Sequence, residues 1–205
     1  MDNHATHVLL ALVKDIPTLA IAILSLIVSA FTLFFSHLRG PKISHSIGPT
    51  FLIYYREDGG FGIYLPVTFL NESPTTGIVF RCAIRIIFAK STPEDPFFMP
   101  WRSFCRFAEK KDTEKTYITE EEFAHAITVP PKSSTAKLVL FISRPRSEPA
   151  LRIVEGQMIF QYWTGLAGKS DNEQCKKFSI DVSKQSELDG YLKIKSKKYV
   201  ELELT

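Results

Sequence analysis

A run of about 20 residues, from Ile16 to Phe35, contains no charged side chain. As an α-helix this run would be about 30 Å long, which is the thickness of the hydrocarbon core of a bilayer. Pro17 would lie in the first turn of such a helix and Gly40 follows its other end, and both residue types favour helix ends. The sequence therefore predicts one transmembrane helix over residues 16–38, after an N-terminal segment of residues 1–15.

Two other interpretations of this run fit less well. A cleaved signal peptide would use the V-S-A sequence at 28–30 as its cleavage site, but Asp15 follows Lys14 and the apolar run continues past that site to Phe35. A buried helix of a soluble domain would keep a polar face, and this run has none. We therefore expect a retained anchor.

Basic residues around the run predict its orientation. Lys14 is the only Lys or Arg before the run, whereas Arg39 and Lys42 follow it closely. Because the flank that is richer in Lys and Arg usually stays in the cytoplasm, we expect a cytoplasmic C-terminal domain. The expected location is the cell inner membrane, which the chain would cross once.

The cysteines agree with a reducing compartment. Cys82, Cys105 and Cys175 are an odd set without the spacing of a metal site or a disulfide framework. The triplet that begins at Asn71 (N-E-S) matches the glycosylation pattern, which would matter only in a secretory lumen. An asparagine in a loop is the commoner meaning of such a triplet.

Length and charge limit the possible functions of the remainder. Residues 43–205 are enough for one domain with its own core. The chain has 25 Lys and Arg against 22 Asp and Glu, so it lacks the strong positive charge of a nucleic-acid-binding protein. We expect one soluble domain and no nucleic-acid partner.

Apolar residues in this domain recur mostly with a period of two, which is typical of strands with one buried face. The expected strands cover residues 51–55, 61–70, 77–89, 97–107, 126–129, 138–143, 157–164, 178–182 and 199–204. Alternation is expected to point four side chains inward, those of Ile84, Ile86, Leu140 and Ile142. Without a strong helix between the strands, the sequence predicts a mainly β fold, an antiparallel sandwich of two sheets.

Several short motifs resemble those of a known group of proteins. They are R-G-P-K-I at 39–43, L-P-V-T-F-L-N at 65–71, G-I-V at 77–79, V-P-P-K-S-S at 129–134 and L-V-L-F at 138–141. The chain resembles uncharacterised prokaryotic single-span membrane proteins with an R-G-P-[KD]-I segment beside the membrane. This resemblance implies an immunoglobulin-like β-sandwich after the transmembrane helix, and it implies no catalytic residues.

Motifs for cofactors and metals are incomplete. The G-K-S of residues 168–170 resembles the end of a phosphate-binding loop, but Trp163 stands where the first glycine of that motif should be. A hairpin loop explains this segment better. None of the five histidines is spaced with Cys, Asp or Glu as a metal site requires. We expect no cofactor and no metal.

One dense group of acid–base side chains precedes residue 126. Glu121 and His125 are four apart in the stretch E-E-E-F-A-H, so they would share one face of a short helix over residues 119–124 with Thr119 as its N-cap. A solvated charged turn explains the same residues without catalysis. We therefore expect that the protein is not an enzyme.

Two function classes remain. The favoured hypothesis is an interaction or accessory module without catalytic activity, whose loops or edge strand bind another protein beside the bilayer. The alternative is a membrane-bound sensor-effector whose domain binds a small charged ligand such as a nucleotide. The candidate contacts for a ligand or partner are Arg102, Arg106, Lys169 and Lys176.

The span itself contains a stripe of small side chains, Ala22, Ser25 and Ser29. Small residues at such spacing let two membrane helices approach closely. The sequence thus predicts possible self-association through the span, although small residues also face lipid in many anchors.

Overall fold

The computed structural model of the protein describes residues 3–35, 40–88, 97–109, 116–144, 155–165, 172–193 and 198–205, and in the first helix it describes side chains from residue 17 onward. The chain forms two compact units, Met1–Pro41 and Lys42–Thr205. Each unit is considered by itself below.

The N-terminal unit contains helix α1 (Asn3–Leu33). This helix begins well before the start predicted at Ile16, and Pro17 lies inside it. The stretch L-L-A-L at residues 9–12, before Pro17, consists of good helix formers, and a proline removes one backbone hydrogen bond from the helix. The large apolar side chains between Leu19 and Phe35 are exposed.

Over the part of the chain that the structure describes, none of the helices combines the length with the apolar character that crossing a bilayer requires.

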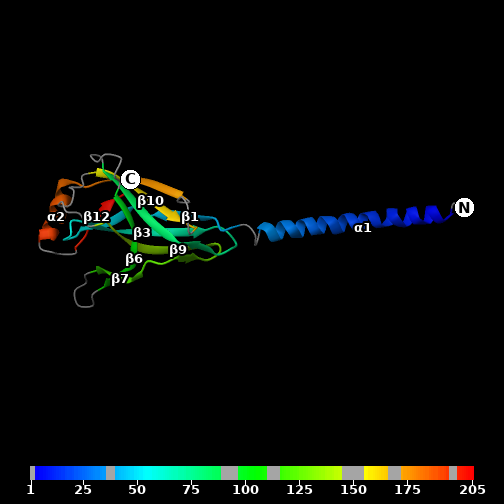
Figure 1. Cartoon of the computed structure of the whole chain (residues 1–205), viewed down its shortest axis with the longest axis horizontal. Helices are drawn as coiled ribbons and strands as arrows, with labels where there is room; N and C mark the ends of the chain where they lie inside the picture. The colour runs from blue at the N-terminus through cyan, green and yellow to red at the C-terminus, as the bar shows by residue number, and fades with distance from the viewer. Residues whose placement is uncertain are drawn as a thin grey trace. The chain divides into compact units, whose positions relative to one another are not determined.

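The second unit is mainly antiparallel β-structure (Figure 1). Its strands are β1 (Ile43–Ile47), β2 (Thr50–Tyr55), β3 (Phe61–Asn71), β4 (Gly77–Val79), β5 (Arg81–Phe88), β6 (Phe97–Glu109), β7 (Thr116–Phe123), β8 (Ile127–Val129), β9 (Ser133–Ile142), β10 (Glu155–Trp163), β11 (Asn172–Ser179) and β12 (Val200–Glu203). Helix α2 (Val182–Lys193) lies between β11 and β12 in the sequence. The prediction of a mainly β, antiparallel fold is confirmed.

Ten of the described strands form two layers that share β6, and β4 and β8 pair as a separate two-stranded sheet. One layer has the order β12-β2-β3-β9-β6-β7, with β1 also paired to β3, and the other has the order β11-β10-β5. The first residues of β6 pair with β5, and its later residues pair with β9 and β7. Beyond β12, Thr205 exchanges two backbone hydrogen bonds of 2.9 Å with Lys177 of β11. The layers are therefore joined on both sides, as in a flattened barrel.

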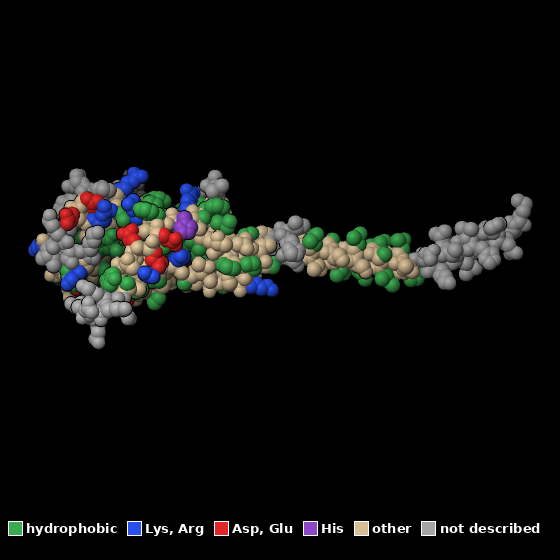
Figure 2. Space-filling model, turned by 90° about the horizontal axis from the view of Figure 1, so that it is seen from below, with side chains coloured by type: hydrophobic (Ala, Val, Ile, Leu, Met, Phe, Trp, Pro, Cys, Tyr) green, Lys and Arg blue, Asp and Glu red, His purple; other side chains and the backbone are tan. Residues whose placement is uncertain are grey.

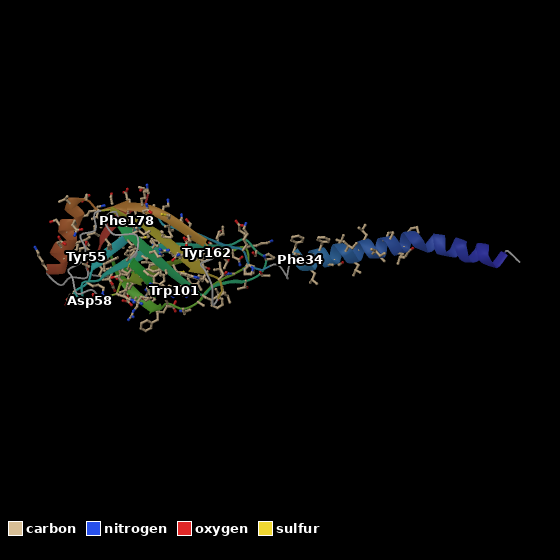
Figure 3. The ribbon with its side chains drawn as sticks, turned by 45° about the horizontal axis from the view of Figure 1, so that its top comes forward. Phe34, Tyr55, Asp58, Trp101, Tyr162 and Phe178 are labelled. Carbon is tan, nitrogen blue, oxygen red and sulfur yellow. The ribbon has the colours of Figure 1, made fainter. Side chains whose placement is uncertain are left out.

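The inner faces of the two layers bury the main core. Alternate residues of β3 point into it, and Tyr162 and Phe178 of the opposite layer lie among the strands (Figure 3). The inward direction predicted for Ile84 and Ile86 is confirmed, since both are fully buried in this core.

The direction predicted for Leu140 and Ile142 is wrong. In β9 it is Val139 and Phe141 that enter the main core, whereas Leu140 is buried in a second apolar cluster on the opposite face of the layer. Tyr54 covers part of that face and lies so close to β3 that a Cβ atom at Gly62 would be 2.3 Å from its ring. Because β9 is apolar on both faces, alternation alone could not show which set of side chains faces the core.

Helix α2 was not predicted from the sequence. Asp181 caps its start, since its carboxylate accepts a 2.7 Å hydrogen bond from the backbone N–H of Lys184. Leu188 is fully buried in the main core, and the Tyr55 hydroxyl of β2 donates to the Gln185 side chain at 3.1 Å. The helix therefore closes the end of the sandwich at which β2 turns into β3 (Figure 1).

Asn71 organises the opposite end of the sandwich. Its fully buried side-chain amide lies 2.8, 3.0 and 3.2 Å from the backbone carbonyls of Thr75, Val129 and Pro130. Its carboxamide oxygen accepts a 3.0 Å hydrogen bond from the backbone N–H of Ser73. The folded domain has no room for a glycan on this nitrogen, so the N-E-S triplet has a structural role.

The same network fixes the start of the second unit. The Ser73 hydroxyl accepts a hydrogen bond from the backbone N–H of Lys42, and the Lys42 carbonyl accepts one from the N–H of Glu72 at 3.3 Å. The Ser73 carbonyl accepts from the Lys132 N–H at 3.1 Å, at the turn between β8 and β9. Asn71 thus connects two loops and the first residue of the domain.

Replacing Asn71 with alanine should destabilise the domain by about 2–4 kcal/mol, because it leaves buried carbonyl groups without a donor. Chemical denaturation of the full chain in detergent measures this loss. The matched control is Glu72→Ala, which removes only the exposed ion pair with Lys42 and should cost less than about 1 kcal/mol. Equal stability of the two variants would contradict the role of Asn71.

Candidate partner-binding surface

Strands β6 and β7 form a ribbon at one edge of the sandwich, and two of the predicted contact residues lie on it. Arg102 and Arg106 are exposed on β6. The Arg102 guanidinium lies 5.9 Å from the centre of the Phe123 ring, and the Arg106 Nε lies 3.5 Å from a carboxylate oxygen of Glu121. The structure therefore places both arginines beside β7.

Where β6 pairs with β7, the described part of the ribbon exposes three aromatic side chains: Phe123 by 75%, Phe107 by 54% and Tyr117 by 49%. Phe107 pairs with Ile118, and Tyr117 pairs with Ala108. Since neighbouring residues of a strand point to opposite faces, Phe107 and Tyr117 emerge on different sides of the ribbon. The ribbon thus presents aromatic side chains on both faces.

The ribbon also ends in an unpaired edge. Within the described residues β7 pairs with β6 alone, so no other strand covers its outer edge. An exposed edge of this kind can accept a further strand from a partner through backbone hydrogen bonds. The ladder is irregular between Phe104 and Cys105, where Glu121 is the extra residue of β7. Such a bulge increases the local twist of an edge.

The short helix predicted over residues 119–124 is wrong, because these residues belong to strand β7 up to Phe123. Thr119 is consequently no helix cap. The acidic side chains instead make local pairs: Glu120 accepts from the Ser103 hydroxyl at 2.9 Å, and Glu122 lies 3.5 Å from Lys137 and 4.0 Å from His125. Glu121 and His125 do not share a helical face.

These pairs leave the ribbon with charges of both signs. Figure 2 shows acidic and basic side chains interspersed on the face that it displays, without a large patch of one sign. Exposed ion pairs of this kind contribute little stability. Glu121 and Glu122 each have a basic partner, whereas Glu120 accepts from a neutral hydroxyl, so the aromatic side chains are the distinctive feature of the ribbon.

The other predicted ligand contacts lie elsewhere. Lys176 is a residue of β11, which is separated from β6 by β10 and β5 in the strand order, so the structure does not group it with Arg102 and Arg106. Lys169 lies outside the described residues.

A hollow of about 390 Å³ lies beside the end of β11 and the start of α2. Its lining residues are Lys177, Phe178, Ser179, Asp181, Lys184, Glu203 and Thr205. Lys176 is not among them, since it points to the other side of its strand from Lys177. Two Lys and two acidic side chains give the lining no excess of either charge.

The small residues of the span, Ala22, Ser25 and Ser29, are exposed on α1. Because they are three and four residues apart, they lie along one side of the helix. Nothing described in the N-terminal unit covers them.

The outer face of the first layer next to the ribbon is aromatic and relatively dry. The Tyr54 and Tyr64 rings stack with their centres 5.5 Å apart, and burial raises the pKa of both phenols. Burial also raises the pKa of the Cys105 thiol to about 11 and that of the Cys82 thiol well above its ordinary range. Both thiols are therefore protonated and poorly nucleophilic at neutral pH.

Metal-binding groups do not converge in the described part of the chain: no three His, Cys, Asp or Glu side chains lie together at ligand distance. All three cysteines are free, and only Cys175 is exposed. The titratable residues near β7 take part in the ion pairs and the hydrogen bond described above.

Sequence patterns found the arginines of the ribbon but not its aromatic residues. Thr116–Phe123 reads T-Y-I-T-E-E-E-F, in which the first four residues are all good strand formers. The strand was not predicted because three glutamates follow, and a charged stretch usually indicates a loop or the surface of a helix. Comparison of the chain with protein-family models, with curated proteins and with solved structures finds no match.

Proposed function

We propose that this protein is a membrane-anchored β-sandwich module without catalytic activity, and that it binds another protein through the β6–β7 ribbon. The observation that carries this proposal is the edge of β7, which is unpaired within the described residues and is flanked by exposed Phe107, Tyr117 and Phe123. Aromatic anchors dominate the energetics of protein interfaces, and an open strand edge supplies matching backbone donors and acceptors.

The membrane part of the proposal rests on the sequence. Residues 16–35 carry no charge, and the large apolar side chains described on α1 are exposed. Lipid tails would cover these side chains at no cost in hydrogen bonding, since every backbone group of a helix is bonded internally. We place the helix across the cell inner membrane with the sandwich in the cytoplasm, on the basis of Arg39 and Lys42. Ala22, Ser25 and Ser29 would allow two such anchors to pack together.

We further propose that the sandwich is immunoglobulin-like. In that fold one sheet has the strand order A-B-E-D and the other contains C, F and G. The order β2-β3-β9-β6 in one layer and β5-β10-β11 in the other follows the same sequence of connections. This arrangement supports the resemblance to single-span proteins with an immunoglobulin-like domain.

The second candidate function is a sensor-effector that binds a small charged ligand such as a nucleotide. The feature that favours it is the hollow between β11 and α2, where Lys177 and Lys184 would contact a charged ligand beside Asp181 and Glu203. A thermal-shift screen of the full chain with nucleotides distinguishes the two functions, since only a specific ligand stabilises the folded state by mass action.

Replacing both Leu24 and Ile27 with arginine should release the chain from membranes, because each charge near the centre of a span costs about 2.5–3.5 kcal/mol. Alkaline extraction of membranes measures the retained fraction. The control, Ser25→Leu with Ser29→Leu, should stay in the membrane. Recovery of the unmodified chain in the soluble fraction would contradict the anchor, and phosphatase activity of an alkaline phosphatase fused after Thr205 would reverse its orientation.

Replacing Tyr117 and Phe123 with serine should reduce capture of the partner from solubilised membranes by about tenfold or more, since exposed aromatic anchors of this kind each contribute about 1–2 kcal/mol. Affinity capture followed by quantitative mass spectrometry measures the loss. Phe98→Ser is the matched control, because Phe98 is 50% exposed on β6 but outside the β7 pairing. Undiminished capture by the double variant would remove the ribbon from the proposal.

A further inference from the structure

His45 is the central residue of β1, and its half-buried side chain turns its imidazole toward β10. Neither ring nitrogen is accessible to solvent or has a hydrogen-bond partner among the described residues. The ring instead contacts aromatic side chains of β10: its centre lies 5.0 Å from that of Phe160 and 5.0 Å from that of Tyr162. A neutral imidazole is tolerated here as a flat, largely apolar group.

No charged group faces this imidazole from the strands packed against it, within the described residues. On β3 its register partner is Phe69, and its neighbours on β1 are Ser44 and Ser46. On β10 the one titratable neighbour is Tyr162, whose hydroxyl donates to the Ile43 carbonyl at 2.7 Å. The site therefore offers no carboxylate to balance a charge on the ring.

β1 is also the strand that follows directly on the start of the domain. The Ser73 network holds its N-terminal side at Lys42, and Tyr162 holds Ile43. β1 also pairs with β3 from Ile43 to Ile47, and Ile47 is buried in the main core. Packing of His45 against β10 thus lies in the middle of a short strand whose two ends are held in place.

We propose that β1 is a pH-sensitive clasp, in which protonation of His45 loosens β1 from the sandwich. The imidazolium would have two N–H donors that neither water nor an acceptor among the described residues reaches, which is unfavourable compared with a hydrated imidazolium. Aromatic rings attract cations, but this attraction offsets only part of the lost hydration, and the Tyr162 ring meets the imidazole at 63°.

The direction of the pH effect follows from burial. Desolvation lowers the pKa of His45 from its ordinary value of 6.5. Because the unfolded or detached state binds the proton more readily, β1 keeps its full stability above about pH 6.5 and loses it as the pH falls below that value. His125 differs, since its imidazole is exposed and lies beside Glu122.

Hydrogen exchange of the full chain in detergent tests the clasp. Amide protection is measured by mass spectrometry at about pH 7.5 and about pH 5.5, with rates corrected for intrinsic pH dependence. Residues 43–47 of the unmodified chain should lose protection several-fold at the lower pH, while β9 keeps its protection. His45→Phe, which preserves a flat ring, should abolish this loss, and His125→Gln should leave it unchanged.

Two results would overturn the proposal: full protection of β1 at the lower pH, or parallel losses in the unmodified chain and in His45→Phe. If His45→Phe does not fold, imidazole resonances of the unmodified chain decide the question by NMR. His45 should remain neutral below its ordinary pKa of 6.5, and the β1 amide resonances should change together with those of the His45 ring. Titration of His45 at its ordinary pKa would refute the clasp.

Discussion

Packing of two antiparallel layers onto one apolar core determines the rest of the domain. β6 belongs to both layers, because its first residues pair with β5 and its later residues with β9 and β7. Beyond its pairing with β5, β6 continues along β9 and β7, and Phe104 there is still buried in the main core. The outer part of the β6–β7 ribbon, which carries Phe107 and Tyr117, is exposed on both faces, and its edge is unpaired within the described residues. The candidate binding surface is thus a consequence of how the core closes.

The strands were predictable where one face is apolar and the other polar. β3 and β5 have such patterns, and the pattern of β5 correctly predicts that Ile84 points inward. β9 is apolar on both faces because Tyr54 and its neighbours cover the outer one, and this long-range packing leaves no local signal. α2 lacks an apolar stripe: it is held by a cap at Asp181 and by one buried side chain, Leu188.

For the candidate sites, too, the sequence indicated some residues but not the contacts that they make. Arg102 and Arg106 were found by their charge. Their contacts depend on the pairing of β6 with β7, and no local sequence pattern indicates that pairing. Asn71 matched a glycosylation pattern and proved to be a buried connector of two loops. His45 showed no pattern at all, since its position between aromatic rings arises from a strand far away in the sequence.

The ribbon is the central functional claim, and site-specific photo-crosslinking in intact membranes tests it most directly. A photoreactive amino acid is placed at Tyr117 on β7 or, for comparison, at Val182 at the start of α2, which is also well exposed. We expect a discrete crosslinked partner from position 117 and none from position 182. A partner crosslinked only from position 182 would contradict it and would move the binding surface to the α2 end of the domain.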